Sequence, residues 1–136
     1  MPGGVALGSQ ASRKGLKMAG EIVHIEFASA DADRAQRFWG GLFGWKFEDS
    51  GMPEMDYRMA QTSPTAGAAI YASDDRDGHP KYYFATDDID ASSAQVRELG
   101  GTADAKVPVP THGWFAPCTD SEGNAFHLWQ ADSAAG

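Results

Sequence analysis

Apolar and polar residues alternate over residues 22–28, and this alternation predicts a half-buried strand. Ile25 and Phe27 point to one face of that strand, whereas His24 and Glu26 point to the other. A strand with this pattern covers a core with one face and presents polar side chains on the other. His24 and Glu26 therefore become the first candidates for chemistry.

After this strand the spacing of apolar residues becomes helical. Asp31 or Asp33 is expected to cap a helix, Phe38 and Leu42 to lie on its apolar stripe, and Gly44 to end it. Glycine- and proline-containing loops then separate three shorter apolar segments. These segments predict strands at about 45–49, 57–61 and 67–72.

The same order of elements returns in the second half of the chain. The predicted elements are a strand at 81–85, a helix at 89–99, and strands at about 102–109, 113–119 and 125–130. The sequence also repeats: the segment 30–33 returns at 87–90, an offset of 87 − 30 = 57 residues. We expect this offset to hold without a gap, so that Ile70 matches His127. Such self-similarity indicates a duplicated structural unit.

These elements predict an α+β fold with two βαβββ units. Each unit must bury one face of its strands, so the fold consists of curved mixed sheets around a cavity, with the helices on the outside. The expected organisation is a disordered leader at 1–19, a first unit at 20–72, a linker at 73–80, a second unit at 81–131 and a tail at 132–136.

Charge and composition narrow the classes of partner. The 136 residues carry a net charge of −8, and 42% of them are hydrophobic, which is enough for a buried core. An acidic chain repels phosphate backbones and anionic lipid surfaces. We therefore expect neither nucleic-acid binding nor membrane binding, and no segment approaches the ~20 apolar residues of a membrane-spanning helix.

Cys118 is the single cysteine of the chain, so no internal disulfide is possible. This fits a reducing compartment, and together with the absence of a secretory signal it predicts a cytoplasmic protein. Cys118 itself is interpreted as a small core residue on a strand.

The repeated segments resemble the vicinal-oxygen-chelate superfamily, which contains glyoxalase I, bleomycin-resistance proteins and extradiol dioxygenases. The resemblance rests on residues 23–27, 33–39 and 42–45 of the first half and on residues 83–91, 99–101 and 120–126 of the second. It covers residues 20–130 and is strongest with the glyoxalase-like single-domain branch. Because this fold supports many activities, the function has to be argued from the site.

The resemblance implies that metal ligands, where relatives use them, lie on the first and last strand of each unit. By position these places are His24, Ile70, Lys81 and His127. An isoleucine has no donor atom, and an ammonium group has no lone pair to offer. We therefore predict no cofactor and no resident metal; if a divalent metal binds, His24, His127 and Glu26 are the expected ligands.

The same four places predict the catalytic residues as His24, Glu26, Lys81 and His127. His24 or Glu26 would act as the base, and Lys81 would stabilise a developing oxyanion. Two interpretations of Lys81 stay open. It forms a structural ion pair with Glu26, or it anchors an anionic substrate beside a general base.

Aromatic residues on the strands are candidates for ligand contact, because large rings on a cavity face suit a flat or apolar ligand. The candidates are Tyr57, Tyr83, Trp114 and Trp129. Tyr57 and Trp114 are separated by 114 − 57 = 57 residues, so they are expected at equivalent places in the two units.

The leading functional hypothesis is a glyoxalase-like protein that acts on a small molecule, as an atypical or metal-independent enzyme of the lyase or isomerase type. The alternative is a non-catalytic protein that sequesters a toxic or aromatic compound, as bleomycin-resistance proteins do. A third interpretation is a structural or regulatory protein with an empty cavity. The resemblance also implies a homodimer.

Overall fold

The computed structural model describes residues 19–74 and 80–136. In chain order the elements are β1 (Ile22–Ser29), α2 (Ala32–Phe43), β2 (Glu48–Asp49), β3 (Tyr57–Ser63), β4 (Ala66–Ala72), β5 (Lys81–Ala85), α3 (Ile89–Glu98), β6 (Thr102–Ala103), β7 (Val107–Val109), β8 (Gly113–Thr119) and β9 (Ala125–Ala131). Nearly all of the expected leader and residues 75–79 of the expected linker lie outside the described ranges. No helix within those ranges is long and apolar enough to cross a membrane.

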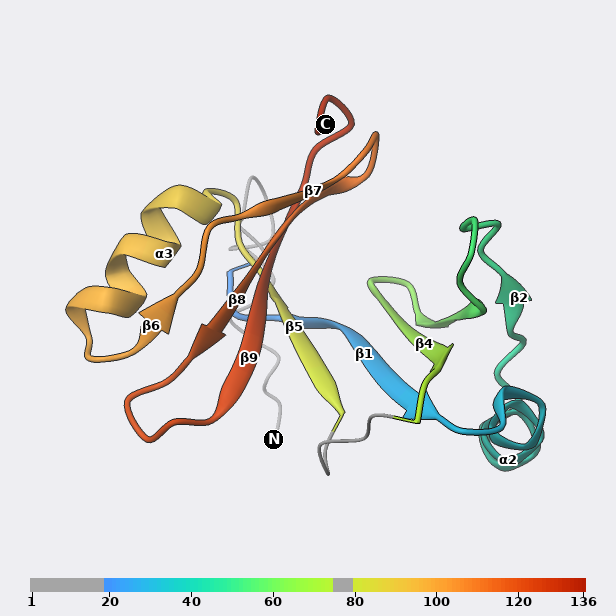
Figure 1. Cartoon of the computed structure of the whole chain (residues 1–136). Coiled ribbons are helices and arrows are strands. Elements are labelled where there is room, and N and C mark those ends of the chain that lie inside the picture. Colours follow the sequence, from blue (N-terminus) through green and yellow to red (C-terminus); the bar gives the residue numbers. More distant parts are fainter. Residues whose placement is uncertain (1–18, 75–79) are drawn as a thin grey trace, which may run out of the picture.

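The α+β fold with two βαβββ units is confirmed. All nine strands belong to one sheet, in the order β2-β3-β4-β1-β5-β9-β8-β6, with β7 paired to β8. The two units meet where β1 and β5 pair antiparallel, and within each unit the first strand pairs parallel with the last. Figure 1 shows the two halves of the sheet diverging from this junction, with α2 beside one half and α3 beside the other.

Side-chain caps begin both helices as the sequence predicts. The carboxylate of Asp31 accepts a hydrogen bond from the backbone N–H of Arg34, and Asp88 does the same for Ala91. Gly44 ends α2 in the left-handed region, at φ 74°, which a residue without Cβ adopts at little cost.

The predicted apolar stripe of α2 is wrong in part. Phe38 is 60% exposed and Leu42 is 57% exposed, so neither is a core residue. Trp39 instead faces the sheet and stacks on Phe27 with 4.7 Å between ring centroids. The predicted strand at 102–109 is also split into β6 and β7, both of which pair with β8.

Two hydrophobic clusters lie between the sheet and the helices, one for each unit. The first contains Ala32, Phe47, Ala60 and Ile70, and the second contains Ile89, Ala116, Cys118 and Leu128. Cys118 is thus a buried core residue, as expected, and burial raises the pKa of its thiol. The core therefore occupies the helix-covered face and leaves the opposite face for other residues.

The strand register corrects the repeat offset. Phe27 lies opposite Ile70 in the first unit, and Phe84 lies opposite Leu128 in the second. The first strands are offset by 84 − 27 = 57 residues, but the last strands are offset by 128 − 70 = 58. Ile70 therefore matches Leu128 and not His127. It is completely buried in the core and does not belong to any ligand position.

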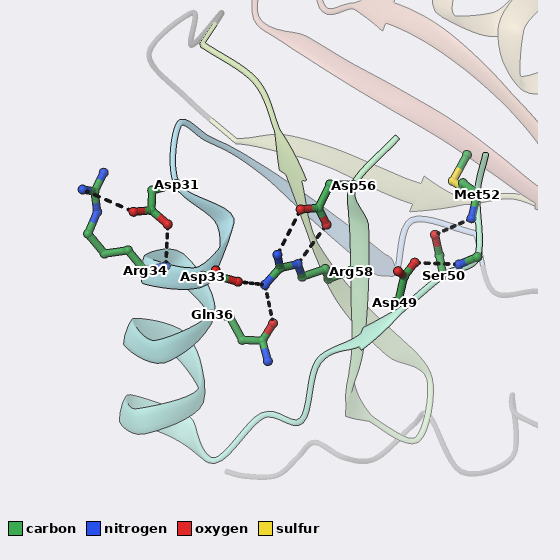
Figure 2. A network of polar contacts seen from close by, with 10 residues as sticks. Asp31, Asp33, Arg34, Gln36, Asp49, Ser50, Met52, Asp56 and Arg58 are labelled. Atoms are coloured by element: carbon green, nitrogen blue, oxygen red, sulfur yellow. Dashed lines mark hydrogen bonds and ion pairs between the residues drawn. The ribbon is translucent and has the colours of Figure 1, made fainter. Parts of the chain in front are cut away.

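Arg58 joins α2 to β3 through a network of charged groups (Figure 2). Its guanidinium donates two hydrogen bonds to the Asp56 carboxylate, at 2.9 and 3.0 Å. It also lies 2.8 Å from the Asp33 carboxylate and donates to the side chain of Gln36. Asp33 and Gln36 belong to the first turns of α2, so the network fixes this helix against the sheet edge.

We expect Arg58→Met to lower the free energy of unfolding by about 1 kcal/mol, because a bidentate pair within a network contributes more than an isolated surface pair. Arg34 is a suitable control, since its side chain is 69% exposed and reaches only Asp31, at 3.9 Å. Urea denaturation of both variants measures the difference. Equal stability of Arg58→Met and Arg34→Met would contradict this role.

Candidate functional site

Four of the predicted site residues share the face of the sheet that the helices leave uncovered, here called the open face. Glu26 on β1 lies directly opposite Lys81 on β5, and His24 lies opposite Tyr83. Tyr83 in turn lies opposite His127 on β9. Side chains directly opposite each other on neighbouring strands point to the same side. The structure therefore places His24 and His127 on one face, on either side of Tyr83.

A short hydrogen-bonded chain occupies the β1 side of the open face. The hydroxyl of Tyr57 donates to Glu26 Oε2 at 2.5 Å and lies 2.8 Å from His24 Nε2. His24 Nε2 also lies 3.6 Å from Glu26 Oε2, and the two side chains are only 18% and 14% exposed. Tyr57 comes from β3 and bridges two residues of β1. It is therefore the residue that joins the predicted base candidates into one unit.

These contacts set the ionisation of the group. Burial alone would raise the pKa of Glu26, but the neighbouring His24 and the hydroxyls of Tyr57 and Tyr83 hold that pKa below its ordinary value. Burial and the Glu26 charge raise the pKa of both phenols. Glu26 is consequently an ionised carboxylate at neutral pH, and both tyrosines keep their protons as hydrogen-bond donors.

Stacked rings occupy the β9 side of the open face. Tyr83 and His127 are parallel with 4.5 Å between their ring centroids, and Phe115 approaches His127 at 5.8 Å. His24 meets the edge of Tyr83 at 5.2 Å. Within the described residues, Nδ1 of His127 is a buried nitrogen with no hydrogen-bond partner. A buried polar atom without a partner is uncommon and marks a place where a ligand atom can bind.

The environment of His127 predicts a pH dependence of stability. Burial lowers its pKa, and the Lys81 charge lowers it further, although Glu26 acts in the opposite direction. Below the ordinary histidine pKa of about 6.5, the unfolded chain therefore binds a proton that the folded chain does not. We expect the free energy of unfolding to fall as the pH drops from 7.5 to 5.5, and His127→Phe to remove part of that fall. Urea denaturation across this range measures it, and an unchanged pH slope would contradict it.

Lys81 is not paired with Glu26, although the two residues are directly opposite. No ion pair joins them, because the Glu26 carboxylate turns toward the tyrosine hydroxyls. The ammonium group of Lys81 lies instead over the ring of Tyr71, 5.1 Å from its centroid. Of the two interpretations left open by the sequence, the structure disfavours the structural salt bridge.

Trp114 is the predicted site residue that the structure places elsewhere. It lies on the helix-covered face, packs against the second core cluster, and donates a hydrogen bond from Nε1 to Asp132 at 3.0 Å. The cause is again the offset of one residue. Tyr57 lies opposite Tyr71 and Phe115 lies opposite Trp129, and 115 − 57 equals 129 − 71, which is 58. Phe115 is therefore the counterpart of Tyr57.

Phe115 and Tyr71 are open-face residues that the sequence analysis missed. The signal for Phe115 was the alternation within its own strand, in which neighbouring aromatic residues must point to opposite faces. Trp129 lies on the open face as expected. Its ring lies directly over Gly113, where an added Cβ would come within 2.7 Å of it. Gly113 thus provides the space in which Trp129 is held.

The donor set does not match a complete metal site. Within residues 19–74 and 80–136, no group of three or more His, Cys, Asp or Glu side chains is close enough to hold one ion. Ala69 occupies the place equivalent to His127, since 127 − 69 = 58, and Ile70 lies in the core. His24 and Glu26 alone offer two donors, and both are already bonded to or near Tyr57. No step is therefore derived through a metal.

Two surface hollows lie away from this cluster. One, of about 690 Å³, lies beside α2, and the other, of about 700 Å³, lies beside Tyr82, Phe84 and Phe126 on the helix-covered face. Neither hollow contains any of the site residues named above. The chemistry of the open face makes it the better candidate, because ionised and hydrogen-bonding groups converge there.

Comparison with known proteins agrees with this fold and site. The glyoxalase-like domain family matches residues 24–129. "Putative glyoxylase CFP32" of Mycobacterium tuberculosis is 32% identical over 124 residues, which cover 82% of this chain and 46% of that protein. A glyoxylase-like domain-containing protein of Didymella fabae is 28% identical and covers 77% of this chain and 89% of its own. The chain spans about half the length of the mycobacterial relative.

Solved structures show the same fold at low sequence identity. Methylmalonyl-CoA epimerase from Mycobacterium tuberculosis has a TM-score of 0.68 at 15% identity, covering 89% of this chain and 95% of its own. A glyoxalase/bleomycin resistance protein/dioxygenase superfamily member from Vibrio splendidus has a TM-score of 0.62 at 12% identity, covering 82% and 98%. With the family match over both units and the paired βαβββ sheet, this chain belongs to the glyoxalase-like domain family of the vicinal-oxygen-chelate superfamily.

Proposed function

We propose that this protein catalyses proton transfer at the carbon next to a carbonyl group of a small molecule, as an isomerase-type enzyme. The observation that carries the proposal is the Tyr57 hydroxyl, which lies within hydrogen-bond distance of both His24 and Glu26 in a half-buried cluster. An ionised carboxylate held by neutral donors is suited to accept a proton and return it. The similarity to methylmalonyl-CoA epimerases adds support at the level of fold.

In this mechanism Glu26 removes the proton from the carbon next to the carbonyl. The bonding electrons move to the carbonyl oxygen and form an enolate, and phenol donors on the open face stabilise its negative charge. Tyr57 and Tyr83 are suited to this role, because their raised pKa values keep them protonated. The proton then returns from Glu26 to the same carbon or to its neighbour, so the reaction consumes no other reactant.

Proton NMR in D₂O tests the proposal. The protein is incubated with ketones, 2-oxo acids and acyl thioesters that carry a hydrogen next to the carbonyl. We expect deuterium to replace that hydrogen in at least one class, at a rate proportional to protein concentration. Tyr57→Phe is expected to slow the exchange by about 10- to 100-fold, since one charge-assisted hydrogen bond contributes roughly 1.5–3 kcal/mol.

Two outcomes would count against this proposal. Compounds that bind without any exchange would indicate the sequestering function, whose affinity should then depend on the open-face rings Tyr83 and Trp129. Exchange that is unaffected by Tyr57→Phe would show that the hydrogen-bonded chain has no part in it. A homodimer and a cytoplasmic location are further parts of the proposal, and the mass of the protein in solution would test the first.

A further inference from the structure

Lys81 is a cation on the open face whose charge is not neutralised by a carboxylate. Its side chain is half-buried, and among the described residues its recorded partner is the Tyr71 ring, 5.1 Å from the ammonium nitrogen. Tyr71 lies opposite Ala28 in the β1–β4 pair, so the β1 residue between the lysine stem and the ring is small. A half-buried ammonium group over an aromatic ring keeps its charge but loses part of its hydration.

A second lysine provides a comparison on the other side of the sheet. Lys106 also lies over an aromatic ring, with Nζ 4.6 Å from the Trp114 centroid, but it forms an ion pair with Asp90 at 3.0 Å. The lysine on the helix side is therefore matched by an acidic residue. Lys81 has a glutamate directly opposite on the neighbouring strand, yet that glutamate is held by the tyrosines.

The position of the charge connects it to the proposed reaction. Glu26 and Lys81 occupy opposite places on neighbouring strands, where Cβ atoms are about 5 Å apart. The charges of both residues reach His127, which shows that they act within one continuous surface. A small molecule anchored at the ammonium group would therefore place its next carbon atoms beside the Glu26 carboxylate.

We propose that Lys81 and the ring of Tyr71 form a subsite for a carboxylate, so that the substrate of the open face is a small carbonyl compound with its own anionic group. This inference rests on the proposed function for the reacting part of the substrate, but the subsite itself is a binding property. It assigns Lys81 an anchoring role in place of the oxyanion-stabilising role that the sequence suggested. In an acidic protein, a local cation is what allows an anion to approach this face.

Ligand-detected NMR with benzoate and its neutral analogue benzamide tests the subsite. We expect benzoate to bind the full chain at least tenfold more tightly than benzamide, and Lys81→Met to remove that preference. Lys81→Arg should retain it, because the charge and the ring contact are kept. Lys106→Met is the matched control, since it removes a lysine from over a ring on the opposite face, and it should leave benzoate binding unchanged.

The results separate this inference from the proposed reaction. Benzoate binding that persists in Glu26→Gln but is lost in Lys81→Met would support the subsite even if no exchange reaction is found. Absence of benzoate binding at 50 mM or below would overturn it, as would equal affinity for benzoate and benzamide. An equal loss in Lys81→Met and Lys106→Met would also overturn it, because the effect would then be one of overall charge.

Discussion

Replacing Glu26 by Gln is expected to lower the rate of deuterium exchange by about 10²- to 10⁴-fold, the usual contribution of a positioned general base. The amide has nearly the same shape as the carboxylate but no longer accepts a proton at neutral pH. The variant should still bind a carbonyl ligand, because the rings and Lys81 are unchanged. Exchange rates by NMR and ligand affinity by titration measure the two effects separately.

Glu48→Gln is the matched control for this experiment. Glu48 lies exposed on β2 at the edge of the sheet, so the same chemical change occurs away from the open face. Its exchange rate should equal that of the unaltered protein. A Glu26→Gln variant with undiminished exchange would exclude Glu26 as the base, and His24 would then be the remaining candidate for that role.

Ile70→Ala is expected to lower the free energy of unfolding by about 3–4 kcal/mol, because the substitution leaves a cavity at a completely buried site. Ile70 packs with Ala32, Phe47 and Ala60 between the sheet and α2. A loss of this size is a large part of the roughly 5–15 kcal/mol that stabilises a typical domain. Urea denaturation monitored by tryptophan fluorescence measures it.

Ile22→Ala provides the comparison for Ile70→Ala. Ile22 is also a β1–β4 sheet residue of the first unit, but it is 46% exposed, so its truncation leaves no closed cavity. We expect it to cost less than half as much as Ile70→Ala. Similar losses in the two variants would contradict the register in which Ile70 faces the core and Ala69 faces the open side.

Local patterns in the chain were sufficient to predict the elements. Asp31, Asp88 and Gly44 mark helix ends because capping depends on hydrogen bonds to residues three or four positions away. The alternation around His24 placed that residue on the polar side of β1. These features depend on neighbours in sequence, and for that reason they could be read without the fold.

Matching between distant strands could not be predicted in the same way. A single residue of additional offset in the last strands exchanges the two faces, because side chains on a strand alternate with a period of two. It moved Trp114 from the expected ligand side to the core side and brought Phe115 to the open face. It also replaced Ile70 with Ala69 as the counterpart of His127.

The amino-acid sequence alone thus determined the two-unit architecture, the family resemblance and the group of His24, Glu26, Lys81 and His127 as residues of one surface. Only the tertiary structure decided how these residues are connected. Tyr57 reaches the Glu26 carboxylate from β3, two strands away in the sheet, and that contact leaves Lys81 without its expected partner. Competition among several donors for one carboxylate depends on distances across strands, and those distances exist only after the sheet has formed.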